Sequence, residues 1–230
     1  MKRSQINAAI RRMEETAKKH GFMLPPFCSW TPENWLGKSH AYDEIRETML
    51  GWDVTDYGEG KFDELGFTLI TLRNGKLNSK YQKTYAEKLL MLEECQYSPM
   101  HFHWYKMEDI INRGGGNILI QVYNAAPDEK LADTLVTVFS DGRRYTVQAG
   151  TQVRLCPGES ITITPYLYHD FKVEPGTGPV LLGEVSMCND DANDNRFYEK
   201  LGRFPAIEED EPPYRLLCNE YPPTVEGEKA

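Results

Sequence analysis

The sequence predicts a mainly β protein whose strands form an antiparallel barrel or jelly roll, with N-terminal helices packed outside it. From about residue 65 to residue 185, short strand-like apolar segments alternate with Gly, Pro and Asx turns. The first third lacks this pattern and carries apolar residues at helical spacing. A chain of 230 residues with 40% apolar composition is also long enough to bury a sizeable core.

The first helix is predicted over residues 4–20 from apolar side chains at helical spacing, namely Ile6, Ala9, Ile10, Met13 and Ala17. Gly21 follows as a C-terminal stop. A second helix is predicted at residues 31–35, because Thr31 can cap its free amides. Residues 52–58 are rich in turn-forming residues and predict turns.

Nine strands are then predicted, over residues 67–73, 85–94, 117–123, 134–139, 145–147, 153–155, 160–164, 169–173 and 180–185. Two dipeptides, Asn74-Gly75 and Asp141-Gly142, predict two-residue hairpin turns. Together these elements divide one domain into three parts. We expect a helical extension over 1–64, the barrel with a metal site over 65–190, and a C-terminal wrap with an acidic tail over 191–230.

Composition limits the classes of partner. A net charge of −9 disfavours binding to nucleic acid or to anionic membranes, both of which call for basic surfaces. The N-terminus is polar and no 18-residue apolar segment occurs, so neither a signal peptide nor a membrane helix is predicted and a cytoplasmic location is expected. The cysteines are scattered singly and predict reduced thiols: Cys28, Cys95, Cys156, Cys188 and Cys218.

Three of the five histidines occur in a pattern that suits a metal ion. His101 and His103 have the period of a strand, so both imidazoles leave the same face. Glu108 follows at a distance that one tight turn can span, and His169 lies in a separate strand-like segment. Imidazoles with a carboxylate suit a divalent Mn, Fe, Co, Ni or Zn ion. The alternative is that these are structural histidines of the strands.

These residues also carry a family resemblance. The His-x-His with its following glutamate, the glycines at 114–116, and the later Pro165 before His169 resemble the two motifs of the cupin superfamily. Residues 99–116, 165–171 and 183–191 further resemble the D-lyxose isomerase family, and the likeness extends over roughly residues 1–221. Where the cupin pattern usually has a glycine before the second-motif histidine, this chain has Leu167 and Tyr168.

The resemblance implies a cupin-type barrel and a metal-dependent homodimeric enzyme. Its reaction would interconvert D-lyxose and D-xylulose, with D-mannose and D-fructose as a further pair, and Mn²⁺ would be the usual metal. In such a reaction the metal polarises the carbonyl and stabilises the developing oxyanion. Four protein ligands, His101, His103, Glu108 and His169, would leave two adjacent positions of an octahedral ion for the sugar oxygens.

The reaction also needs a general base and a proton donor. Glu184 is the candidate base, because it lies in a strand whose apolar neighbours would exclude water; the alternative is a surface carboxylate. Lys106 stands between two predicted ligands and is a candidate to hold a sugar hydroxyl or to protonate an oxyanion. Lys88 and Asp191 are candidate substrate contacts, with an outward-pointing lysine and an acidic turn as the alternatives. A base at Glu184 favours an enediol route over a hydride shift.

Two other functions fit the same motifs. Imidazoles with a carboxylate also bind Fe(II) and activate O₂, so a cupin dioxygenase or another cupin isomerase is an alternative. A non-catalytic cupin that binds a sugar or a metal is another. The polar residues Lys88, Lys106 and Glu184 favour a sugar isomerase over a dioxygenase, whose pocket tends to be more apolar.

Overall fold

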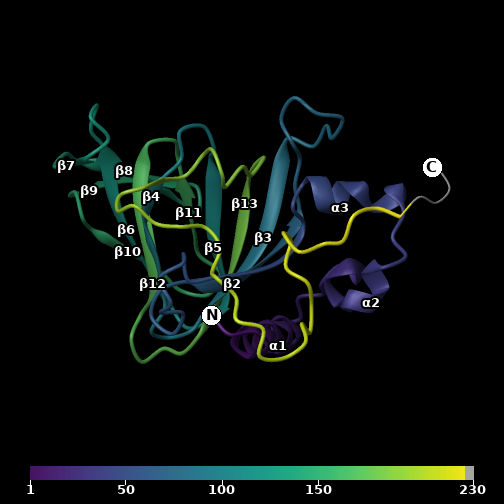
Figure 1. Cartoon of the computed structure of the whole chain (residues 1–230). Helices are drawn as coiled ribbons and strands as arrows, with labels where there is room; N and C mark the ends of the chain where they lie inside the picture. The colour runs from purple at the N-terminus through teal and green to yellow at the C-terminus, as the bar shows by residue number, and fades with distance from the viewer. Residues whose placement is uncertain (226–230) are drawn as a thin grey trace.

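The computed structural model describes residues 1–225, and in it two antiparallel sheets curl into a half-barrel with helices outside (Figure 1). The predicted mainly β fold class is therefore confirmed. The end of the predicted acidic tail, residues 226–230, lies outside the described residues. Among the described residues, no helix is long and apolar enough to span a membrane.

The helices are α1 (Arg3–Lys19), α2 (Pro32–Trp35) and α3 (Asp43–Glu47), with 3₁₀ turns η1 (Pro26–Ser29) and η2 (His40–Tyr42). The larger sheet has the order β1 (Gly51–Thr55), β2 (Phe67–Arg73), β3 (Tyr85–Leu92), β13 (Val180–Met187), β5 (Glu108–Gly115), β11 (Ser160–Ile163), β8 (Val136–Ser140) and β9 (Arg143–Val147). The smaller sheet has the order β10 (Gln152–Leu155), β6 (Ile118–Ala125), β12 (Leu167–Val173), β4 (Tyr97–Phe102) and β14 (Arg196–Phe197), and β7 (Leu131–Ala132) pairs with β6.

Strand β3 shows how the larger sheet buries both of its faces. Leu90 and Leu92 point into the barrel and join the apolar core between the two sheets. Leu89 and Met91 alternate with them and join a second core on the outer face. A strand buried on both faces has a nearly continuous apolar sequence, and this explains why residues 85–94 lack polar alternation.

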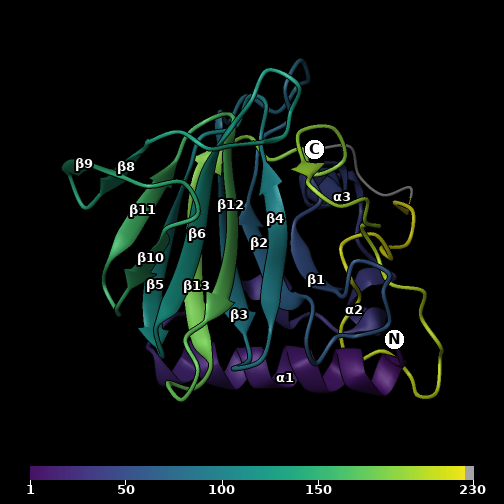
Figure 2. The same ribbon diagram turned by 90° about the vertical axis from the view of Figure 1, so that its left-hand side faces the viewer.

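Helix α1 covers the outer face of the larger sheet (Figure 1 and Figure 2). Its predicted apolar side chains are all buried, and they pack against Trp52, Ile70 and Leu181 of the sheet. The helix ends at Lys19, and Gly21 takes φ +70°, so the predicted C-terminal stop is confirmed.

The predicted two-residue hairpin at Asn74-Gly75 is wrong. β2 and β3 do pair antiparallel, but residues 74–84 connect them. The Asn74 amide donates to the carbonyls of Thr48 and Asn189, so tertiary contacts hold this residue instead of a local turn. By contrast, the predicted Asp141-Gly142 turn is confirmed, since both residues have positive φ and join β8 to β9.

Turns were also predicted for residues 52–58, and the structure corrects half of that segment. Residues 51–55 form β1, which is buried throughout and pairs with β2, so the sheet begins before residue 65. Only the following residues turn, where Asp56 accepts a hydrogen bond from the Gly58 amide. Two of the glycines at 114–116 belong to a strand, because β5 extends through Gly115.

The C-terminal segment crosses the molecule and returns to α1. β14 pairs with β4 beside the barrel interior. Further on, the buried Arg3 guanidinium of α1 is bracketed by Glu209 at 2.6 Å and Glu220 at 2.5 Å. The two ends of the chain are thereby tied together, and residues 191–204 are held across the barrel interior.

The packing of α1 gives a test of the outer core. Replacing Ile10 with Ala should lower the free energy of unfolding by about 2–5 kcal/mol, because the fully buried side chain leaves a cavity against the sheet. Glu15→Ala, on the exposed face of the same helix, should change it by less than about 0.5 kcal/mol. Urea denaturation measures both; equal effects would contradict the assigned face.

Candidate active site

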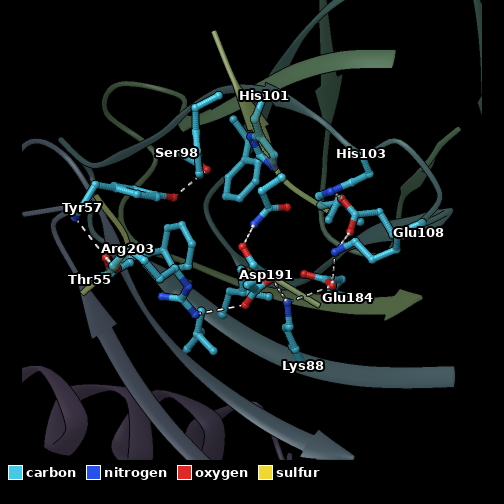
Figure 3. A pocket seen from close by; sticks show the side chains of 18 residues that line it. Thr55, Tyr57, Lys88, Ser98, His101, His103, Glu108, Glu184, Asp191 and Arg203 are labelled. Atoms are coloured by element: carbon cyan, nitrogen blue, oxygen red, sulfur yellow. Dashed lines mark hydrogen bonds and ion pairs between the residues drawn. The ribbon is translucent and has the colours of Figure 1, made fainter. Parts of the chain in front are cut away.

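A polar pocket lies in the barrel interior, above the apolar core. It encloses about 500 Å³ of open space and is lined by strands of both sheets and by the segment 191–203 (Figure 3). Seven of the eight residues predicted from sequence to act at the site line this pocket. The eighth, His169, lies behind the lining with its ring tilted against that of His101 and the ring centroids 4.2 Å apart.

The three predicted histidine ligands converge because of strand pairing between β4 and β12. His101 lies directly opposite His169 in this antiparallel pair, and His103 follows β4 immediately. Each imidazole has a ring nitrogen that lies within 4.8 Å of a ring nitrogen of each of the other two. All three side chains are buried.

Backbone carbonyls orient the three imidazoles. Nδ1 of His101 lies 2.7 Å from the Pro99 oxygen, and Nδ1 of His103 lies 2.8 Å from the Asp194 oxygen. Nδ1 of His169 lies 3.1 Å from the Leu167 oxygen. A carbonyl only accepts, so each Nδ1 must carry a proton, and Nε2 is the nitrogen of each ring that can bind a metal ion. This is the arrangement in which metal-binding imidazoles are usually held.

Glu108 supplies a carboxylate to the same point. Its Oε1 lies 3.3 Å from Nε2 of both His103 and His169. The tight turn predicted between His103 and Glu108 is formed by residues 103–107, with the Asp194 carboxylate accepting from the backbone amides of Tyr105 and Lys106. The register then starts β5 at Glu108, directly opposite Ser186 of β13.

This donor set fits a divalent first-row metal ion. Three imidazoles and one carboxylate face one point, and these are the N and O donors that such an ion binds. Nε2 of His169 is buried and makes no hydrogen bond within residues 1–225, an expensive state unless another partner binds there. Burial and the neighbouring imidazoles also lower the pKa of His101 well below its usual range, which keeps that ring neutral.

The positive charge of Lys106 compensates the negative charges of two buried carboxylates. Its Nζ lies 2.6 Å from Oε2 of Glu108 and 3.1 Å from Oε1 of Glu184. Burial raises the pKa of Glu108, but the attraction of the Lys106 ammonium outweighs it and holds that pKa well below its usual range. Burial lowers the pKa of Lys106, but the two carboxylates raise it by more than burial lowers it. The net shift of the pKa is upward, and Lys106 stays charged.

Glu184 is buried, as predicted, but its surroundings are charged instead of apolar. It lies directly opposite Lys88 in the pairing of β13 with β3, and the Lys88 Nζ is 3.3 Å from its Oε1. With Lys106, two ammonium groups therefore contact one carboxylate. Strand alternation turns Glu184 and Lys88 into the barrel, so the outward-pointing alternative for Lys88 is excluded.

Asp191 lies across the pocket, between Lys88 and Arg203 (Figure 3). Burial raises its pKa, but Lys88 and Arg203 outweigh that effect and hold the pKa well below its usual range. It is therefore a charged member of the site and not merely part of a solvent-exposed acidic turn.

Sequence reasoning missed two polar residues of the site. Asn189 accepts hydrogen bonds from Lys88 at 2.6 Å and from Lys106 at 3.2 Å. Arg203 contacts Asp191 at 3.0 Å and the buried Asp53 at 2.6 Å. Both come from irregular segments without periodicity. The only sequence signal was that Asn189 and Asp191 belong to one short polar stretch after a buried strand.

Comparison with known proteins places this site in a family. The family model described as D-lyxose isomerase matches residues 1–221. The chain is 49% identical to a D-lyxose/D-mannose isomerase from Serratia proteamaculans and 48% identical to one from Escherichia coli O157:H7. Each match covers 96% of this chain and 98% of the relative.

Solved structures share the fold at much lower identity. L-ribose isomerase from Cellulomonas parahominis in complex with L-ribose has a TM-score of 0.56 at 14% identity. L-ribose isomerase from Acinetobacter sp. DL28 has a TM-score of 0.56 at 13% identity. Both matches cover 90% of this chain and 98% of the other, and at such identity they show the fold alone. From its whole-length match and its two relatives at nearly half identity, the chain belongs to the D-lyxose isomerase family and is an isomerase.

Proposed function

We propose that the protein interconverts D-lyxose and D-xylulose, and also D-mannose and D-fructose, with one divalent metal ion held by His101, His103, Glu108 and His169. The observation that carries this proposal is the convergence of three Nδ1-anchored imidazoles and one carboxylate beside a buried Glu184. The two relatives are named as acting on D-lyxose and D-mannose. Family membership as an isomerase disfavours the dioxygenase and the non-catalytic alternatives.

The bound metal would polarise the sugar carbonyl and stabilise the negative charge that develops on its oxygen. Mn²⁺ is the proposed ion, and Co²⁺, Fe²⁺, Ni²⁺ or Zn²⁺ suit the same donors. The backbone carbonyls at the three Nδ1 atoms hold the rings in orientations that direct each Nε2 to the proposed metal.

Glu184 is the proposed base. Its carboxylate would remove the proton from C2 of the aldose, giving an enediolate, and return it to C1, while the proton of the O2 hydroxyl passes to O1 to complete the ketose. Lys88 and Lys106 hold the carboxylate in place through contacts of 3.3 Å and 3.1 Å.

Lys106 is assigned a holding role in preference to proton donation. Its raised pKa makes the ammonium a poor acid, whereas its charge suits stabilisation of oxygen atoms that become negative. Lys88 and Asp191 are proposed as contacts for the more distant sugar hydroxyls, because both line the pocket. A homodimeric state and a cytoplasmic location both stay predictions, and the homodimer rests on the family resemblance.

Metal removal tests the proposed reaction directly. Protein stripped with a chelator should not convert D-lyxose to D-xylulose, and added Mn²⁺ should restore conversion. His101→Ala should bind Mn²⁺ much more weakly and stay inactive at the same concentration of added metal, because one of the four donors is gone. Ketose formation and metal content are measured together. Conversion by metal-free protein, or no conversion of D-lyxose or D-mannose by loaded protein, would overturn the proposal.

The base has a separate test. Glu184→Gln keeps the shape of the side chain but removes its capacity to accept a proton, so kcat for D-lyxose should fall by about 10²–10⁴-fold. Mn²⁺ content should stay at the wild-type value, because Glu184 is not a proposed ligand. The exchange of the C2 proton of D-lyxose with solvent deuterium should disappear with turnover. Near wild-type kcat in this variant would exclude Glu184 as the base.

A further inference from the structure

The catalytic pocket is walled by buried side chains on all but one side. Fourteen of its eighteen lining residues are buried. The four that are partly exposed all belong to the segment after β13: Asp191, Asn195, Phe197 and Arg203. A sugar must therefore pass beside this segment to reach the metal donors.

A second, larger cavity lies against two of those four residues. It contains about 1100 Å³ of open space, compared with about 500 Å³ in the catalytic pocket. Asp191 and Arg203 line both cavities, so their ion pair of 3.0 Å stands between them. Asn195 and Phe197 line only the catalytic pocket.

Strand register places the two cavities side by side along the inner face of the larger sheet. Thr71 of β2 lines the second cavity, and its direct cross-strand partner is Lys88 of β3, which lines the catalytic pocket. On β1, Asp53 faces the second cavity, and Thr55, two residues on, faces the catalytic pocket.

The chemistry of the second cavity suits an uncharged polyhydroxylated molecule. Asp53 is 1% exposed, and its Oδ1 has no hydrogen-bond partner among residues 1–225, which leaves an acceptor for a hydroxyl group. Acidic side chains outnumber basic ones in the lining and disfavour an anionic sugar phosphate: Glu47, Asp53, Asp190 and Asp191 against Lys76 and Arg203. Apolar patches from Met49, Leu77 and Phe204 complete the wall.

We propose that this second cavity is the entrance through which the free sugar reaches the catalytic pocket, with the Arg203 side chain as the partition between them. Arg203 is held by Asp53 at 2.6 Å on one side and by Asp191 at 3.0 Å on the other. Swinging the guanidinium onto Asp53 alone keeps its charge paired and opens the way past Asp191. The proposal rests on the proposed sugar isomerisation for its ligand.

Obstruction of the entrance tests the route. Ala192 is exposed and lines only the second cavity, so Ala192→Phe narrows the entrance without touching the catalytic pocket. Glu199→Phe is the matched control, exposed on the same segment and lining neither cavity. The probe is a non-reacting pentitol added to Mn²⁺-loaded protein, followed by stopped-flow tryptophan fluorescence, beside steady-state conversion of D-lyxose.

Ala192→Phe should slow pentitol association and dissociation alike, by about tenfold, and leave Kd unchanged, since an obstacle on the path affects both directions. kcat/KM for D-lyxose should fall by a similar factor, with the control at wild-type values. Wild-type rates of pentitol association and dissociation in Ala192→Phe would overturn the proposed entrance. Wild-type conversion of D-lyxose by the same variant would leave the proposed isomerase function intact. A changed Kd would show damage to the site and also count against the proposal.

Arg203→Gln tests the partition. A shorter, uncharged side chain no longer spans Asp53 and Asp191, so both pentitol rates should rise by about threefold or more. The melting temperature is measured alongside, because the buried Asp53 loses its cationic partner and the partly exposed Asp191 loses one of two. Unchanged rates in a folded variant would assign the partition to another residue and overturn this part of the proposal.

Discussion

The barrel interior is organised by a chain of alternating buried charges. Four carboxylates, of Glu108, Glu184, Asp191 and Asp53, are linked by three cations, of Lys106, Lys88 and Arg203, at 2.6–3.4 Å. An unpaired charge in such a place would cost several kcal/mol, so each side chain depends on its neighbours in the chain. The described cluster has one more negative than positive charge, which favours a bound cation beside Glu108.

Strand pairing turns this electrostatic requirement into geometry. The smaller sheet brings two histidines face to face across β4 and β12, and the larger sheet brings Glu184 opposite Lys88 across β13 and β3. The donors and the proposed base thus come from different sheets, and the curl of the barrel makes them converge. A shift of one residue in either register would turn these side chains out of the interior. The apolar cores on both faces of the larger sheet hold that register.

The segment after β13, residues 188–204, contributes contacts both to the fold and to the site. Asn189 joins the two lysines, Asp194 orients both His103 and the turn that follows it, and Arg203 closes the far side of the pocket. None of these residues lies in a strand with a readable period, and the sequence reasoning found only Asp191 among them. A single hairpin dipeptide was misleading in the same way, because Asn74 makes its hydrogen bonds to Thr48 and Asn189 instead of closing a turn.

The sequence by itself determined the strand-rich class, the helix α1 with its buried face, and the histidine motif, because each depends on residues close together in the chain. The period of a strand puts His101 and His103 on one face, and helical spacing selects the face of α1 that packs on the sheet. Tertiary structure alone decided that Glu184 contacts two ammonium groups, that Arg203 separates two cavities, and that residues 51–55 are a buried strand. These features arise from pairings between segments distant in the chain, where burial and charge compensation outweigh local propensity.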